Sequence, residues 1–175
     1  NIKNIEEKSD PFVYFDNAAF PGSFILAMNH YAKTVNRTKL RTEHQHIKWY
    51  ASSLLANTQA NQAPLEDSYA LYKNYPDNWL MNPHNNGDIS NIENINNFQA
   101  QMEQKEGNSH SVDLYTCDLG MDVSDDYNNQ ELLHSYLNIC QIFCGLAVLK
   151  PGGNLAVKHY TLFEPITIKY LTLLS

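Results

Sequence analysis

Short apolar runs alternate with amphipathic segments along this chain, and that alternation limits the possible folds more than any other feature of the sequence. The runs are rich in aromatic and branched side chains, a composition that predicts buried strands. They occupy residues 12–15 (FVYF), 47–55 (IKWYASSLL), 112–118 (VDLYTCD) and 154–160 (NLAVKHY). Between them lie segments with apolar residues three or four positions apart, the spacing that predicts helices.

The predicted helices occupy residues 24–37, 89–105, 127–149 and 164–174. Residues 56–86 are predicted to form an irregular excursion with one helical turn near residues 65–72 (LEDSYALY). The first helix is expected to bury Phe24, Ala27, Met28 and Tyr31. The second is expected to bury Ile92, Ile95, Phe98 and Met102. The apolar positions of the third are Leu132, Leu133, Tyr136, Leu137, Cys140, Ile142 and Phe143.

Helix ends are also visible in the sequence. Ser90, followed three residues later by Glu93, predicts a capping box at the start of the second helix. The stretch KPGG at residues 150–153 is expected to end the third helix, with glycine after the last turn and lysine against the helix dipole.

The resulting order of strands and helices predicts an α/β fold, a mostly parallel sheet with helices on both faces. Ligands of such sheets bind outside the carboxyl ends of the strands. Asp16, Asp118 and Lys158 each stand at such a strand end, so we expect them to share one rim of the sheet. Any one of them alone is more often a solvated loop residue, and a lysine at a strand end often simply reaches water.

Length and charge narrow the function classes. The 175 residues suffice for one domain with a core of its own. No apolar run suggests a bilayer span or a signal peptide. The net charge of −7 disfavours a free-standing nucleic-acid binder, which usually has a basic patch. The chain begins at Asn1 rather than methionine and stops inside an apolar helical pattern. We therefore expect a single domain over residues 1–175 that is an excerpt of a longer polypeptide, incomplete at both ends.

Three cysteines cannot build a disulfide framework. Cys140 and Cys144 are four residues apart in a predicted helix, so they share a face and are interpreted as small core residues. This usage fits a reducing compartment.

Two loops are candidate ligand contacts. FDNAAFPGSF (residues 15–24) places a Pro-Gly turn between a strand and a helix, where backbone N–H groups can approach a ligand, although it matches neither of the common nucleotide-binding loop patterns. NNGDISNIENI (residues 85–95) carries Asp88 just before a helix. Asp88 is either a turn or capping residue, or an acceptor for an amine edge such as that of adenine.

The stretch TCDLGMDVS (residues 116–124) offers two interpretations. Asp122, Asp125 and Asp126 follow Asp118, and clustered carboxylates suit hard cations. The spacing of these aspartates is not that of an EF-hand, and no His or Cys completes a set of zinc ligands. The histidines of HQHIKW (residues 44–49) are interpreted as exposed polar residues before a strand. No metal site is therefore predicted. The favoured interpretation is an Asp118–Lys158 acid–amine pair in which burial lowers the lysine pKa toward that of a useful base.

Taken in order, the stretches FDNAAFPGSF, LEDSYALY, NNGDISNIENI, DLYTCDLGMDVS, NNQELL and LKPGGNLAVKHYTLFEPITIKYL resemble the FtsJ-like ribose 2'-O-methyltransferases. Within that family they look most similar to the mRNA cap-specific branch, and especially to versions from large cytoplasmic DNA viruses of the African swine fever type. The resemblance covers nearly the whole chain from Phe12 and is most specific over residues 112–174.

This resemblance implies a Rossmann-like fold that uses S-adenosyl-L-methionine to methylate the ribose 2'-hydroxyl next to the cap of an mRNA. By motif, Asp118 resembles the aspartate and Lys158 the second lysine of a Lys-Asp-Lys-Glu tetrad whose other members would lie outside residues 1–175. The implied cofactor-binding residues are Asp16, Asn17, Ala18, Pro21, Gly22, Ser23, Phe24, Asp88, Ile89 and Asp118.

The family loop is usually richer in glycine, of the form D-x-G-x-x-P-G-G-F, and in this chain Asn17, Ala18 and Ser23 replace its small or glycine positions. The resemblance implies that the protein binds capped RNA and a capping or transcription partner, and no membrane. It also implies a location in the host cytoplasm or in a virion. Two alternatives stay open at this point. The glycine-poor loop and the acidic charge favour a degenerate methyltransferase fold kept as a binding or structural subunit. A small-molecule methyltransferase is the weaker alternative, because many of those enzymes have no lysine at the position of Lys158.

Overall fold

The computed structural model describes residues 11–39, 47–54, 66–120, 124 and 126–174 of the chain. Within these residues the strands are β1 (Phe12–Asn17), β2 (Ile47–Ser52), β3 (Val112–Cys117) and β4 (Leu149–Val157). The helices are α1 (Ser23–Lys39), α2 (Leu71–Asn74), α3 (Ile92–Glu106), α4 (Gln130–Val148) and α5 (Pro165–Thr172), with short 3-10 turns η1 (Pro76–Asn78) and η2 (Tyr127–Asn129). Leu55, the predicted last residue of the second strand, and Asp122 and Asp125 of the acidic cluster lie outside the described residues.

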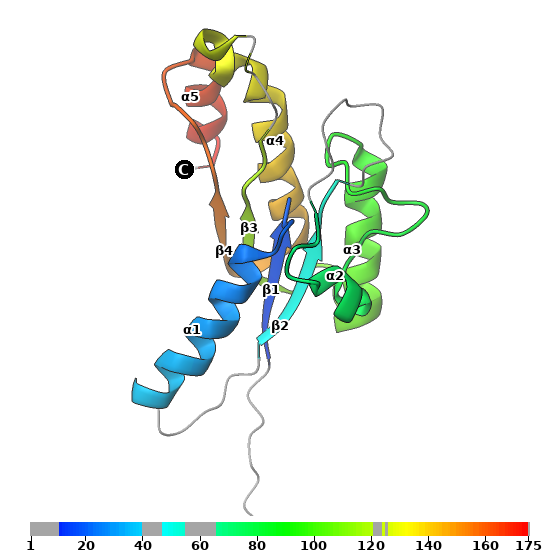
Figure 1. Cartoon of the computed structure of the whole chain (residues 1–175). Helices are drawn as coiled ribbons and strands as arrows, with labels where there is room; N and C mark the ends of the chain where they lie inside the picture. Colours follow the sequence, from blue (N-terminus) through cyan, green and yellow to red (C-terminus); the bar gives the residue numbers. More distant parts are fainter. Residues whose placement is uncertain (1–10, 40–46, 55–65, 121–123, 125, 175) are drawn as a thin grey trace, which may run out of the picture.

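The strands form one sheet in the order β2-β1-β3-β4, and every neighbouring pair is parallel (Figure 1). The predicted α/β architecture is therefore confirmed. The register sets Asn17 beside Ser52 and Cys117, and Cys117 beside Val157. All four strands thus end at the same edge of the sheet, which we call the carboxyl rim.

Helices cover both faces of the sheet because successive strand side chains point to opposite sides. Phe15 of β1 packs with Phe98 of α3 and Cys144 of α4, and this cluster covers one face. Its neighbour Tyr14 packs with Ile25 of α1 on the other face. The cysteines of the described residues are free and buried, which confirms their interpretation as core residues.

The buried face of α1 differs from the predicted one. Ile25 is fully buried and Met28 packs partly against the same cluster, whereas Phe24 and Tyr31 are exposed. Apolar residues lie on both sides of this helix, so the three-or-four spacing fitted two faces equally well. The sheet selected the face that contains Ile25.

The capping box predicted at Ser90 is wrong, because α3 begins one residue later. Asn91 is the N-cap, and its side-chain oxygen accepts a hydrogen bond of 3.0 Å from the backbone N–H of Glu93. The Ser90 hydroxyl donates instead to Asp88 Oδ1 at 2.6 Å. Ile92 is exposed as well, so the buried face of α3 consists of Asn94, Ile95, Phe98 and Met102.

Replacing Asn91 with alanine should lower the free energy of unfolding by about 1 kcal/mol, the usual cost of losing such a cap. Urea unfolding of the purified protein measures the change. Asn96→Ala is the matched control, because Asn96 is exposed within the same helix and alanine there should be neutral or slightly stabilising. Equal losses in the two variants would show that the capping bond is not the cause.

Two predictions about the third helix also need correction. The stretch KPGG does not end it: α4 stops at Val148, and β4 starts at Leu149, so these residues belong to the strand. The predicted apolar face of α4 is buried only in part: Cys140 and Ile142 are buried. Four other predicted residues are exposed: Leu132, Leu133, Tyr136 and Phe143. Several polar residues are buried in their place: Glu131, His134, Asn138 and Gln141.

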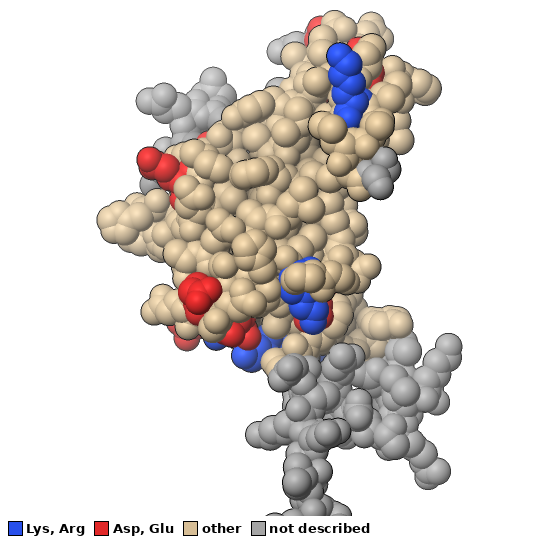
Figure 2. Space-filling model, turned by 180° about the vertical axis from the view of Figure 1, so that it is seen from behind, with Lys and Arg blue, Asp and Glu red and all other residues tan. Residues whose placement is uncertain are grey.

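The expectation that no apolar run suggests a bilayer span needs correction: by length and composition alone, the segment Tyr127–Val148 is long and apolar enough to cross a membrane. Half of its most apolar window is buried inside the domain, as expected of a core helix. Seen from the side opposite to that of Figure 1, the molecule shows only scattered Lys and Arg side chains (Figure 2). That face therefore offers no extended basic patch of described residues.

Candidate active site

The predicted acid–amine pair is present at the carboxyl rim. Lys158 follows the last residue of β4 and Asp118 follows the last residue of β3, so the two lie on neighbouring strand ends. The Lys158 Nζ lies 2.6 Å from Asp118 Oδ1. The Lys158 backbone N–H donates to the Cys117 carbonyl at 3.0 Å, which extends the pairing of β4 with β3 by one residue.

The protonation expected of Lys158 is corrected by this geometry. The hydrogen bond to Asp118 raises the pKa of Lys158 above its ordinary value, and the opposing effect of burial is smaller. About half of its side chain, 47%, is exposed, which explains why burial has so little weight. Lys158 therefore stands at the rim as an ammonium group rather than as a neutral base.

An aromatic ring lies beside the ammonium. The Lys158 Nζ is 5.2 Å from the centroid of the Tyr160 ring, within the range of cation–π attraction. The Tyr160 hydroxyl in turn approaches Gly120, where an added Cβ would lie 2.7 Å from that oxygen. Because Gly120, two residues after Asp118, has no side chain, Tyr160 can pack close to the Asp118–Lys158 pair.

Asp16 ends up buried at the same rim, with 2% of its surface exposed. The Thr116 hydroxyl donates to Asp16 Oδ1 at 2.5 Å, and the Tyr14 hydroxyl lies 2.7 Å from the Thr116 oxygen. Burial raises the pKa of Asp16 from 3.8 to about 7, the hydrogen bonds oppose this rise, and the nearby charge of Asp118 adds to it. Asp16 is therefore a carboxyl group that can exchange a proton near neutral pH.

The loop after β1 is fixed from inside the core. Asn17 is buried and donates through Nδ2 to the Tyr115 hydroxyl at 3.0 Å, and its Oδ1 accepts from the Ala18 N–H at 2.8 Å. Ala18 adopts a φ of 56°, a left-handed conformation that costs a non-glycine residue about 1 kcal/mol. The family pattern has glycine at this position, which this conformation explains.

The rest of the loop runs along the rim into α1. The Ala19 N–H donates to the Ser52 carbonyl at 2.9 Å and so ties the loop to the end of β2. Pro21 is half-buried and Gly22 is buried, while Ser23 and Phe24 are exposed in the first turn of α1. The first turn of an α-helix has N–H groups without an intrahelical partner, and that turn of α1 follows the loop directly.

Asp88 follows Gly87, which packs against the Ser53 carbonyl just after the end of β2. Its Oδ1 accepts from the Ser90 N–H at 2.9 Å and from the Ser90 hydroxyl, so it forms the turn that its sequence position also suggested. Among the described residues no donor is bonded to its Oδ2. The following residue, Ile89, is 2% exposed and packs in the core, so its side chain supports this loop.

Sequence reasoning missed the serines at the end of β2. Ser52 is fully buried, and within the described part of the chain its hydroxyl has no hydrogen-bond partner. Gly87 packs on the Ser53 carbonyl so closely that an added Cβ would lie 2.0 Å from that oxygen. This contact brings the Asp88 loop against the end of β2. The signal for Ser52 was only its position, one of four strand ends at the rim.

The structure thus divides the predicted residues into two groups. Asp16, Asp118 and Lys158 lie close to one another, and the Asp88 loop and the loop after β1 flank the end of β2. No hydrogen bond or ion pair between described residues connects Asp88 to the Asp118–Lys158 pair. The described residues also contain no cluster of three potential metal ligands.

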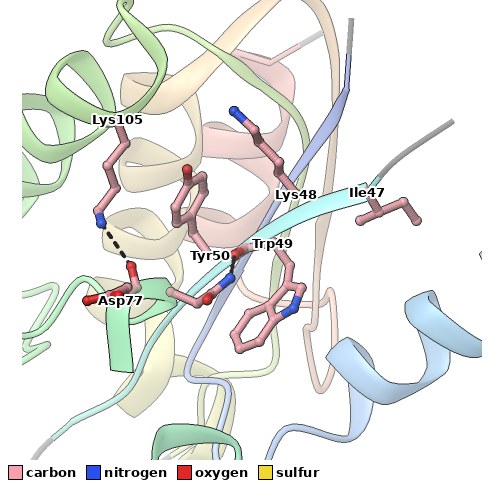
Figure 3. Close-up of a pocket in the computed structure, with 7 residues that line it drawn as sticks. Ile47, Lys48, Trp49, Tyr50, Asp77 and Lys105 are labelled. Atoms are coloured by element: carbon pink, nitrogen blue, oxygen red, sulfur yellow. Dashed lines mark hydrogen bonds between the residues drawn. The ribbon is translucent and has the colours of Figure 1, made fainter. Parts of the chain in front are cut away.

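A pocket of about 360 Å³ lies elsewhere, beside the first residues of β2 (Figure 3). Its two lysines already have partners: Lys105 donates to the Asp77 carbonyl at 2.8 Å, and Lys48 pairs with Glu106 at 2.9 Å. Tyr50 also donates to Glu106. Because the pocket is away from the carboxyl rim and its cations are paired, it is not the candidate site.

Comparisons with known proteins agree with this geometry. A model of the FtsJ-like methyltransferase family matches residues 2–175. Over the full chain, 36% of residues are identical to the probable methyltransferase EP424R of African swine fever virus (isolate Pig/Kenya/KEN-50/1950), and the match covers 40% of that protein. The chain thus spans about two fifths of the length of this relative.

Two more distant relatives come from a giant virus and an animal. The uncharacterized protein L511 of Acanthamoeba polyphaga mimivirus is 31% identical over 98% of the chain and 20% of its own length. The cap-specific mRNA (nucleoside-2'-O-)-methyltransferase 2 of Danio rerio is 31% identical over 89% of the chain and 20% of its own length. With the family match over nearly every residue, a parallel α/β sheet and a charged pair at its carboxyl rim, the chain belongs to the FtsJ-like methyltransferase family.

Proposed function

We propose that this chain transfers a methyl group from S-adenosyl-L-methionine to the ribose 2'-hydroxyl near the cap of an mRNA. One observation carries the proposal: Lys158 Nζ lies 2.6 Å from Asp118 at the carboxyl rim, where this class of sheet binds its ligands. Names of relatives give further support, since the Danio rerio protein is called a cap-specific mRNA 2'-O-methyltransferase.

Members of the family use S-adenosyl-L-methionine, and the rim has residues that fit it. The Asp88 Oδ2 is an acceptor beside the end of β2, suited to the amine of adenine. The loop from Asn17 to Gly22 would face the amino-acid part of the cofactor. When bound, the cofactor supplies a methyl group on a positively charged sulfur.

Within the proposed reaction, Lys158 orients the acceptor. Its ammonium donates a hydrogen bond to the ribose 2'-oxygen and stabilises the partial negative charge that develops there as the hydroxyl proton leaves to water. Asp118 holds the ammonium in place and keeps it protonated. The Tyr160 ring lies beside the ammonium.

A second candidate function is a binding subunit that has lost catalysis. Ala18 favours it, because this residue keeps the left-handed backbone of the family loop without the glycine that adopts it easily. The two candidates differ in whether a methyl group moves.

The test is an assay of the full-length protein for methyl transfer from labelled S-adenosyl-L-methionine to a short capped RNA. We expect label in a nuclease-resistant dinucleotide at the 5' end. A capped RNA with a 2'-deoxy first nucleotide and an uncapped RNA are the matched substrates, and both should accept much less label. Cofactor binding without transfer to any RNA would favour the binding subunit.

A further inference from the structure

The buried part of α4 carries a stripe of polar side chains beside its apolar core residues Cys140, Ile142, Cys144 and Val148. The stripe consists of Glu131, His134, Asn138 and Gln141, spaced three, four and three residues apart, as on one face of a helix. Each is less than a tenth exposed. Burying such groups costs free energy unless they find partners, so their partners show what the stripe holds.

The side chain of Gln141 binds the backbone of Lys158. Its Nε2 donates to the Lys158 carbonyl at 3.0 Å and to Asn138 Oδ1 at 3.1 Å. The Lys158 N–H is already bonded to the Cys117 carbonyl at 3.0 Å. Both backbone polar groups of Lys158 are therefore fixed, one by β3 and one by α4.

Glu131 holds the segment that follows. Its carboxylate accepts hydrogen bonds from the Thr161 hydroxyl at 2.6 Å, the Phe163 N–H at 3.0 Å and the Glu164 N–H at 2.8 Å. It stands in the first turn of α4, and Glu164 is the N-cap of α5. One carboxylate thus lies at the N-termini of two helices, where negative charge is favoured.

His134 contacts the residue between these two anchors. Its ring centroid lies 4.9 Å from that of Tyr160, the ring beside the Lys158 ammonium. The strand β4 ends at Val157, so the backbone beyond Lys158 has left the sheet. The bonds from α4 take the place of the missing strand pairing over residues 158–164.

We propose that this stripe positions Lys158 for catalysis, with Gln141 and Glu131 as positioning residues that fix the backbone on either side of Tyr160. The inference rests on the proposed function and assigns a role to residues that do not touch the substrate. A shift of about 1 Å in a catalytic group can cost roughly 100-fold in rate. Loss of either anchor lets the ammonium move relative to the acceptor hydroxyl.

The test compares Gln141→Leu and Glu131→Ala with Gln99→Leu. Gln99 is the matched control, because its Nε2 donates to a backbone carbonyl of α4, that of Ala147 at 2.7 Å, away from Lys158. We expect the first two variants to lower kcat at least tenfold with the Kd for cofactor within twofold of the parent. The control should lose comparable thermal stability and keep kcat within twofold.

A double-mutant cycle separates positioning from general damage. In a Lys158→Ala background, Gln141→Leu should lower the residual single-turnover rate by less than twofold, because the group it positions is gone. A full tenfold loss in that background, or an equal loss of kcat in Gln99→Leu, would overturn the positioning role.

A readout without activity distinguishes failure of this inference from failure of the proposed function. The Lys158 side chain, labelled with ¹³C at Cε, can be titrated by NMR in each variant. We expect its raised pKa to fall toward the ordinary lysine value in Gln141→Leu and Glu131→Ala and to stay raised in Gln99→Leu. If this result is obtained and the parent protein transfers no methyl group, the stripe positions Lys158 but the proposed function is wrong. If the Lys158 pKa is unchanged in all three variants, the stripe does not position Lys158.

Discussion

Replacing Lys158 with methionine should lower kcat for methyl transfer by about 100-fold to 1,000-fold, the range over which a single hydrogen-bond donor to a developing negative charge contributes. Methionine keeps most of the length of the side chain but removes the charge. The cofactor should still bind with a Kd within about twofold of the parent, since the change removes an interaction with the acceptor hydroxyl. Single-turnover kinetics with saturating capped RNA measures the loss.

Two controls sharpen this prediction. Lys169→Met makes the same substitution on the exposed side of α5 and should leave kcat unchanged. Lys158→Arg keeps the charge with a different hydrogen-bond geometry, so an intermediate rate is expected. A Lys158→Met variant with more than a third of the parent rate would remove Lys158 from the proposed mechanism.

The pH profile separates the ammonium from a neutral base. The pKa of Lys158 is raised by its hydrogen bond to Asp118, so the ammonium persists to higher pH than in an isolated lysine. If the ammonium is the active form, kcat falls only at strongly alkaline pH, as Lys158 loses its proton. A kcat that instead rises with pH through the lysine pKa would indicate a neutral amine acting as base.

Much of the rim was predictable because it follows from the order of the elements. Strands that alternate with helices pair in parallel, so their carboxyl ends meet at one edge. Asp118 and Lys158 each follow such an end, and the sheet order sets their strands side by side. Hence a purely local pattern indicated a contact between residues 40 positions apart in the sequence.

The helix faces were not predictable in the same way. On α4 the exposed residues include Leu132 and Phe143, while Glu131 and Gln141 are buried. Periodicity assigns apolar side chains to the core and misses polar ones whose partners lie on a distant loop. Those partners are three backbone groups and the Thr161 hydroxyl within residues 158–164, and they come within reach only once α4 has packed beside the end of β4.

The state of Asp16 was likewise hidden from the sequence. A charged residue at a strand end was expected at the rim, but its burial could not be inferred from neighbouring residues. Burial depends on Tyr14 and Thr116, which enclose the carboxyl group from two adjacent strands. The second large prediction follows from that burial.

Asp16→Asn should raise the free energy of unfolding at pH 8 by roughly 2–4 kcal/mol and change it little below pH 4. Because the folded pKa of Asp16 is raised from 3.8 to about 7, the folded state binds a proton more tightly than the unfolded state. The protonated Asp16 carboxyl therefore contributes to the free energy of unfolding. This contribution is complete below about pH 4 and is lost as pH rises through about 7. Asparagine has a similar shape, carries no charge and can still accept from Thr116, so it avoids this loss.

Urea unfolding of the parent and the variant below pH 4 and at pH 8 measures the difference, and Asp77→Asn, a change of an exposed aspartate in η1, is the matched control. The control should change stability by less than about 0.5 kcal/mol at both pH values. A lower stability of Asp16→Asn at pH 8 would show that the buried carboxylate is well solvated or paired.

The same substitution tests why the chain keeps a carboxyl group in a place that destabilises it. If Asp16 contributes to cofactor binding, as its loop suggests, Asp16→Asn should weaken cofactor binding while it stabilises the fold, since residues selected for function often lower stability. Calorimetric titration with S-adenosyl-L-methionine at pH 8 measures that loss. A variant that is more stable and binds the cofactor as well as the parent would remove Asp16 from the site and leave its burial without a functional reason.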